Sequence, residues 1–171
     1  MAFETVKSKI GDYAKDIRLN LDNVLQSDAL TPQQVYGTVV AIAHQTKNKD
    51  LLADAEALAA EHIDAQHITA AKTASALMAM NNIYYRFAHL VEGGHEYTKM
   101  PARLRMTGLA THGVDKATFE LWCLAVSAYN GCGMCITAHE KEVLHAGLSK
   151  AAVQDAVRIT AVLNAAHVAS S

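Results

Sequence analysis

The sequence predicts an all-α protein that forms a single domain of about six to eight helices. Apolar residues recur at helical spacing through most of the chain, and no run alternates with period two between turn residues. Only 2 prolines and 9 glycines interrupt this pattern. A length of 171 residues suits one domain with a substantial core and is too short for us to expect two.

The individual helices follow from the periodicity and from their end signals. We expect helices at 32–46, 50–61, 65–90, 116–130, 133–146 and 150–168, after a lead at 3–26 that is irregular or briefly helical. Thr31, Pro32 and Gln34 form the pattern of an N-cap, a proline in the first turn and a capping box. Ser149 is placed to cap the last helix, and Gly147 is placed to end the helix before it.

A less regular connection, which begins at Gly93-Gly94 and ends at Met100-Pro101, divides the domain into two halves. Residues 1–92 form the first half and residues 100–171 the second. Both halves contain helices of similar length in the same order.

These halves suggest an internal pseudo-repeat, because a shift of 84 positions aligns Gln33–Thr46 with Ala117–Asn130. Two alanine-rich helical units can also align by chance, so both explanations stay open. The reactive residues do not repeat, since Asn48 falls on Cys132 and Leu51 falls on Cys135. We therefore expect a non-catalytic first half and a catalytic second half.

Composition argues against several functions. A formal net charge of −2 is not that of a nucleic-acid-binding protein, which usually has a basic face or tail. The start, Met1–Lys7, carries charges where a secretory signal needs an apolar run. The longest apolar stretch, near Leu121–Tyr129, is far shorter than the roughly 20 residues that span a bilayer. We expect a cytoplasmic protein that binds neither membrane nor nucleic acid.

The candidate active site is the Cys132-Gly133-Met134-Cys135 segment. Asn130-Gly131 is a typical end for the preceding helix, so a new helix is expected to begin at or just before Cys132. Thiols in the first helical turn face unpaired N–H groups and the positive end of the helix dipole. Both effects favour the thiolate, which is the nucleophilic form of cysteine.

Two further residues complete a catalytic arrangement. His139 follows Cys135 by one helical turn and shares its face, so it can accept the thiol proton directly or through a water. If the helices at 116–130 and 133–146 form an antiparallel hairpin, Cys135, His139 and Glu120 lie roughly 6, 12 and 16 Å from the turn. Glu120 would then lie almost level with His139, which gives the order carboxylate, imidazole, thiol.

Other interpretations of the same residues remain open. Cys132, Cys135 and His139 could bind zinc, with Glu120 or His145 as the fourth ligand, although neither has a familiar spacing. Cys123 lies within an apolar helix and is interpreted as a small buried residue.

Several segments resemble the alkyl hydroperoxidase D (AhpD) family of the carboxymuconolactone decarboxylase superfamily. The similar segments are Tyr13–Leu21, Met80–Arg86, Phe119–Trp122, Ala125–Ala128, Asn130–Cys135 and Ala138–Glu140. The resemblance implies a single AhpD-like domain with an internal pseudo-repeat that assembles as a homotrimer. It also implies an antioxidant peroxidase that reduces small organic hydroperoxides and needs no bound cofactor. Electrons would pass from a lipoyl group on a 2-oxoacid dehydrogenase component, through the dithiol, to the peroxiredoxin AhpC.

The resemblance also assigns roles to residues. Cys135 would be the peroxidatic thiol, and Cys132 the resolving and more exposed thiol. His139 would be the base, and Glu120 would act on it through a proton relay. The family has a histidine in this relay where this chain has Met134, which cannot carry a proton, so the relay here would rest on Glu120 and His139.

Two other functional classes compete with this hypothesis. One is a decarboxylase or ring-lactone enzyme, the other activity of the superfamily, which needs no cysteine pair. The other is a zinc-stabilised, non-enzymatic module. Turnover without both thiols would favour the former, and stoichiometric zinc without free thiols would favour the latter.

Overall fold

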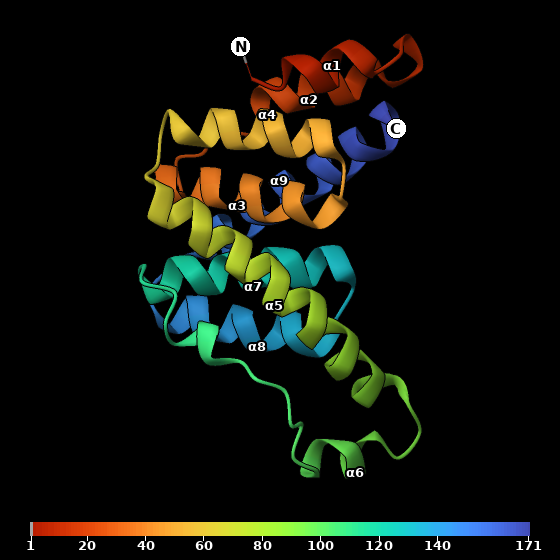
Figure 1. Ribbon diagram of the computed structural model, residues 1–171, viewed down its shortest axis with the longest axis vertical. Helices are drawn as coiled ribbons and strands as arrows, with labels where there is room; N and C mark the ends of the chain where they lie inside the picture. The colour runs from red at the N-terminus through yellow and green to blue at the C-terminus, as the bar shows by residue number, and fades with distance from the viewer. Residues whose placement is uncertain (1) are drawn as a thin grey trace.

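The computed structural model describes residues 2–171, and it confirms the prediction of a single all-α domain (Figure 1). This part of the chain forms nine α-helices, two short 3-10 helices at Asp12–Ala14 and Thr107–Leu109, and no strand. The helices are α1 (Glu4–Lys9), α2 (Lys15–Asn23), α3 (Pro32–Thr46), α4 (Lys49–Ala60), α5 (Ala65–Leu90), α6 (Gly94–Lys99), α7 (Lys116–Asn130), α8 (Gly133–His145) and α9 (Lys150–Ser170).

The six helices expected from periodicity all form, with ends within two residues of the predicted ones. Their starts have the predicted chemistry. The Thr31 hydroxyl accepts from the Gln34 amide at 3.3 Å while the Gln34 side chain accepts from the Thr31 amide at 3.0 Å, which completes the capping box. Ser149 accepts from the Ala152 amide at 3.1 Å and caps α9.

The predicted number of helices, about six to eight, was too low. The 3–26 lead contains two helices, α1 and α2, and the connection expected to be less regular between Gly93 and Pro101 contains α6. These helices have 6, 9 and 6 residues. So few residues do not complete the repeats by which an amphipathic pattern is recognised. Tertiary packing therefore decides their structure, and their sequence alone does not.

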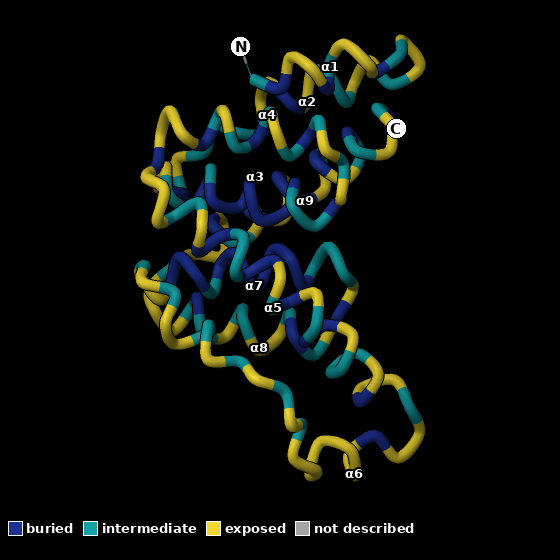
Figure 2. The backbone as a smooth tube through the Cα atoms, in the orientation of Figure 1, coloured by how far each residue is buried: buried dark blue, intermediate teal, exposed yellow. Residues whose placement is uncertain are grey.

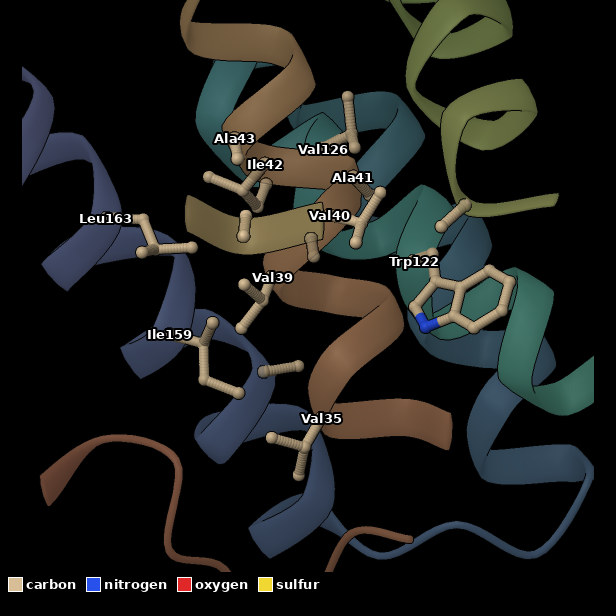
Figure 3. Packing of buried hydrophobic residues seen from close by; sticks show 14 of the residues in the cluster. Val35, Val39, Val40, Ala41, Ile42, Ala43, Trp122, Val126, Ile159 and Leu163 are labelled. Carbon is tan, nitrogen blue, oxygen red and sulfur yellow. The ribbon is translucent and has the colours of Figure 1, made fainter. Parts of the chain in front are cut away.

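The core is centred on α3, which packs against α4, α5, α7 and α9 (Figure 2). Its central residues Val39 to Ala43 are fully buried. In the close-up view, Val39 of α3 and Ile159 of α9 extend toward one another, and Trp122 of α7 lies on the opposite side of α3 (Figure 3). This packing fixes α7, and α7 in turn carries the candidate site.

One close approach between α3 and α7 depends on a glycine. A Cβ atom on Gly37 would lie 2.2 Å from Cζ2 of Trp122, whose side chain is fully buried. The indole ring is rigid and enclosed, so it cannot move away as a flexible side chain could.

Replacing Gly37 by alanine is therefore expected to destabilise the fold by about 1–3 kcal/mol. Helix propensity alone favours alanine by about 1 kcal/mol, so a loss of stability would reveal the steric conflict with Trp122. Urea unfolding followed by circular dichroism measures the difference. Gly133→Ala is the matched control, because a Cβ atom there meets nothing within 4 Å. Equal stability of the two variants would contradict this description of the core.

The helix starts agree with the alignment that suggested a pseudo-repeat. The N-caps of α3 and α4, Thr31 and Asn48, lie 84 positions before those of α7 and α8, Asp115 and Cys132. Gln34 of α3 also donates a hydrogen bond of 3.4 Å from Nε2 to Oγ1 of its counterpart in α7, Thr118. The two equivalent helices thus pack against each other at equivalent positions. The residue that caps α4 is asparagine, whereas a cysteine caps α8.

A projecting arm is formed by the C-terminal end of α5 together with α6, which extends away from the other helices (Figure 1). We call this segment the α5–α6 arm. Its exposed large apolar side chains are Ile83, Phe87, Leu90, Tyr97 and Met100. Within residues 2–171 the structure contains no helix that is both long and apolar enough to cross a membrane.

Candidate active site

The site lies at the tight connection between α7 and α8. Gly131 has a φ of 69°, in the left-handed region that glycine adopts without strain, and it ends α7 as predicted. Cys132 follows immediately as the N-cap of α8, so Cys135 is the third residue of that helix. The prediction that the cysteine pair lies at a helix start is confirmed.

Cys132 and Cys135 form a disulfide. Sγ of Cys132 also accepts a hydrogen bond of 3.3 Å from the backbone N–H of Cys135, as an N-cap side chain does. After reduction, a thiolate at Cys132 would keep this donor and face the positive end of the α8 dipole. The helix start therefore stabilises negative charge on Cys132.

Glu120 of α7 and His139 of α8 meet across the hairpin. Oε2 of Glu120 lies 2.6 Å from Nδ1 of His139, and both side chains are largely buried. An ionised carboxylate only accepts hydrogen bonds, so this contact places the proton of a neutral imidazole on Nδ1. Nε2 is then the nitrogen that can accept another proton. The predicted level placement of Glu120 and His139 is confirmed.

A cavity of about 270 Å³ opens beside these residues. Cys135, Ala138 and His139 of α8 form one wall, together with Met134. The remaining lining residues come from α5 and from the segment around the second 3-10 helix: Met78, Asn81, Tyr85, Met106 and Leu109. Cys135 and His139 therefore line a mostly apolar cavity, which suits an alkyl group.

The relative exposure of the two sulfur-bearing residues differs from the expectation. Cys132 was expected to be the more exposed, yet it is 0% exposed and Cys135 is 6% exposed. Cys132 lies inside the connection, where its amide donates to the Ser127 carbonyl at 3.1 Å. Cys135 lines the cavity and Cys132 does not. A molecule that enters the cavity therefore approaches Cys135.

A polar network holds the connection from behind. Arg86 of α5 donates to the backbone carbonyl of Asn130 at 2.6 Å, and the Asn130 side chain donates to Oδ1 of Asn82 at 3.0 Å. Asn82 in turn donates to the Ser127 hydroxyl at 2.9 Å. Because Asn130 lies two residues before Cys132, these contacts position the start of α8.

Five of the cavity residues were given no role in the site from sequence: Met78, Asn81, Tyr85, Met106 and Leu109. Asn81 belongs to the segment Met80–Arg86, which carried part of the family resemblance but received no role of its own. Met106 and Leu109 lie in or beside a three-residue 3-10 helix. No periodic pattern marks so short an element, so only the folded structure brings these residues to the cavity.

The third cysteine is separate from this chemistry. Cys123 is free and fully buried within α7, as predicted. Burial, and to a lesser degree the nearby Glu120 carboxylate, raise the pKa of the Cys123 thiol well above its ordinary value. It is therefore neutral and inaccessible near neutral pH.

Thiol titration should separate the three cysteines. In the reduced native protein, Cys135 is expected to react with an aromatic disulfide reagent and Cys132 then to displace the reagent from Cys135 as the pair closes to a disulfide, while Cys123 stays unreactive. Cys123 should react only after denaturation, because both its burial and its raised pKa are then lost. Rapid reaction of Cys123 in the native protein, seen by peptide mapping, would contradict this assignment.

The zinc interpretation requires Cys132, Cys135 and His139 to converge with a fourth ligand. Among residues 2–171, no three His, Cys, Asp or Glu side chains converge in a way that could hold a metal ion. His145, considered earlier as a fourth ligand, is the last residue of α8, two turns beyond the site.

Comparison with known proteins places this arrangement in a family. The model of the carboxymuconolactone decarboxylase family matches residues 95–170, which contain α7, α8 and α9. The alkyl hydroperoxide reductase AhpD of Bradyrhizobium sp. is 54% identical over 169 residues, covering 99% of this chain and 93% of that protein. AhpD of Rhodospirillum centenum is 53% identical, with 96% of this chain and 88% of the relative covered. AhpD of Brucella canis is 49% identical, with 99% and 96% covered.

Residues 95–170 of this all-helical domain are thus similar to the carboxymuconolactone decarboxylase family. The relatives named above give a more specific assignment, because each is about half identical to this chain over almost its whole length. The chain belongs to the alkyl hydroperoxide reductase AhpD family.

Proposed function

We propose that this protein is an alkyl hydroperoxide reductase that works through the Cys132–Cys135 pair. One observation carries the proposal: the pair lies at the start of α8, where Cys135 and His139 share a mostly apolar cavity and Glu120 holds the imidazole. The names of the AhpD relatives support the same activity. The roles below are assigned to the residues of this chain on that basis.

Cys135 is the peroxidatic thiol, because it is the cysteine that lines the cavity. His139 takes the thiol proton, and the thiolate attacks the terminal oxygen of R–O–O–H. The O–O bond breaks as an S–O bond forms, so the sulfur is oxidised to a sulfenic acid and the peroxide is reduced to R–O⁻. The proton held by His139 then converts R–O⁻ to the alcohol. Glu120 stabilises the imidazolium while it carries that proton.

Cys132 is the resolving thiol. Its N-cap position favours the thiolate, which attacks the sulfenic sulfur of Cys135 and displaces hydroxide as the disulfide forms. The proton lost by the Cys132 thiol converts this hydroxide to water. An external dithiol then reduces the disulfide in two exchange steps and leaves as its own cyclic disulfide. Cys132 is the better leaving thiolate in the first exchange because the helix start stabilises it.

The electron donor and acceptor follow from the family rather than from the site. We assign the reducing dithiol to a lipoyl group on a 2-oxoacid dehydrogenase component and the disulfide acceptor to the peroxiredoxin AhpC. Both exchanges are cytoplasmic reactions, and the cycle needs no bound cofactor because the cysteine pair stores both electrons.

Assembly as a homotrimer is part of this proposal. The α5–α6 arm exposes Ile83, Phe87, Leu90, Tyr97 and Met100, and contiguous exposed apolar side chains are typical of protein interfaces. Light scattering should give three times the chain mass of 18.4 kDa. A solution mass near that of a single chain would contradict assembly.

The activity is tested by mixing reduced protein with cumene hydroperoxide, or with the disulfide form of AhpC, in parallel rapid-quench experiments. Loss of thiols is followed in each. Oxidation by the hydroperoxide much faster than that of free cysteine at the same pH supports the peroxidase. A rate no higher than that of free cysteine would contradict it, and the ratio of the two rates identifies the main substrate.

A further inference from the structure

Asn81 is a buried polar residue in the cavity wall that the reaction described above does not use. It lies on α5, is 5% exposed, and lines the same cavity as Cys135 and His139. Its Oδ1 atom is buried and has no hydrogen-bond partner within residues 2–171. Buried amide oxygens are almost always paired, so an unpaired one beside a reactive thiol indicates that something else supplies the partner.

The neighbouring residue shows what a purely structural asparagine looks like in this helix. Asn82 is fully buried, donates to the Ser127 hydroxyl at 2.9 Å and accepts from the Asn130 side chain at 3.0 Å. Successive helical residues point about 100° apart, so Asn82 faces the α7–α8 connection while Asn81 faces the cavity. The two adjacent carboxamides thus have different surroundings. Both polar atoms of Asn82 have hydrogen-bond partners within the fold, whereas Oδ1 of Asn81 has none within residues 2–171.

Apart from the Tyr85 hydroxyl, the rest of this wall of the cavity is apolar. Met78 lies one turn before Asn81, and Met106 and Leu109 lie across from α5. On the α8 side, Met134 adds a further apolar surface next to Cys135. A ligand that fits this wall has an apolar body and one small polar end. The polar groups available to that end are the Cys135 sulfur, the His139 ring, the Asn81 carboxamide and the Tyr85 hydroxyl, and of these only Asn81 has a buried oxygen without a hydrogen-bond partner within residues 2–171.

We propose that the Asn81 carboxamide binds the hydroperoxide group and positions it for attack by Cys135. This inference rests on the proposed peroxidase function and adds a binding residue to it. With the carboxamide turned toward the cavity, Oδ1, which is enclosed in this structure, accepts the O–H of R–O–O–H, and Nδ2 donates to the oxygen that leaves as R–O⁻. The O–H proton stays on the oxygen that becomes the sulfenic acid, while His139 supplies the proton for the alcohol.

This role distinguishes the two reactions of the site. A hydroperoxide brings an O–H donor for Oδ1 and develops negative charge on an oxygen near Nδ2. The exchange between a dithiol and the Cys132–Cys135 disulfide brings neither. Loss of the carboxamide should therefore slow oxidation by peroxide and leave reduction of the disulfide almost unchanged.

The test compares wild-type protein with Asn81→Leu, which keeps the volume and removes the polar atoms. The second-order rate constant for oxidation by cumene hydroperoxide should fall at least about tenfold. Reduction of the oxidised protein by dihydrolipoamide should stay within about twofold of the wild-type rate. Asn81→Gln, which keeps a carboxamide one methylene further out, should recover part of the peroxide rate.

Asn82→Leu is the matched control for a structural effect. It removes two hydrogen bonds behind the connection, so it should lower the melting temperature and slow both reactions together. If Asn81→Leu behaves in this way, or if it changes neither reaction, the proposal for Asn81 is overturned while the peroxidase stands. A wild-type peroxide rate no higher than that of free cysteine overturns both.

Discussion

Replacement of Cys135 by serine is expected to abolish peroxide consumption, lowering the rate by at least about a thousandfold. A serine hydroxyl is far less acidic than a thiol, so His139 cannot convert it to a comparable nucleophile. It also cannot be oxidised by a hydroperoxide. Peroxide loss is followed with reduced protein and an excess of dithiol, so that many turnovers are counted.

Cys123→Ala is the matched control for this substitution. It also removes one thiol, but the thiol is buried in α7 and does not line the cavity. Its turnover should stay close to that of the wild type. Full turnover by Cys135→Ser would overturn the assignment of the peroxidatic residue.

Replacement of His139 by alanine is expected to slow oxidation by peroxide by about a hundredfold or more near neutral pH, because the thiol loses its base and the alcohol its proton donor. Glu120→Gln should have a smaller effect, since it weakens only the support of the ring at Nδ1. The two residues act as a unit, so the double variant should be little slower than His139→Ala alone. Raising the pH should partly restore the His139→Ala rate, because hydroxide then ionises the thiol.

Glu142→Gln controls for the loss of a carboxylate on α8. Glu142 is paired with Lys116 at 2.8 Å on the exposed side of the hairpin, away from the cavity. The Glu142→Gln substitution should leave the rate of oxidation by peroxide unchanged. Additive losses in the double variant of Glu120 and His139 would show that the two residues do not work through their contact.

The parts of the site that sequence could predict depend on local rules. The Asn130-Gly131 stop, the new helix at Cys132 and the spacing from Cys135 to His139 all follow from helix geometry within one segment. Glu120 was placed by assuming an antiparallel hairpin with a short connection. The contact between Glu120 and His139 confirms that assumption.

The rest of the site depends on contacts between distant segments. Asn81 lines the same cavity as Cys135 only because the 26-residue helix α5 packs against α7 and α8, and Met106 and Leu109 join this lining from a segment with little regular structure. No spacing rule connects these residues. The lower exposure of Cys132 likewise depends on how the connection packs. The first turn of α8 was therefore predictable from local rules, whereas the cavity beside it, which depends on contacts between distant segments, was not.

The central claim is that the pair is asymmetric, with Cys135 reacting first and Cys132 resolving. It is tested most directly in the Cys132→Ser variant, which keeps Cys135 and lacks the resolving thiol. The reduced variant is treated with one equivalent of cumene hydroperoxide in the presence of a sulfenic acid trap, and the adduct is mapped by mass spectrometry. The predicted result is a single adduct on Cys135, formed at close to the wild-type rate of oxidation. No adduct on Cys135 from this variant, with rapid adduct formation on Cys132 in Cys135→Ser, would contradict the claim.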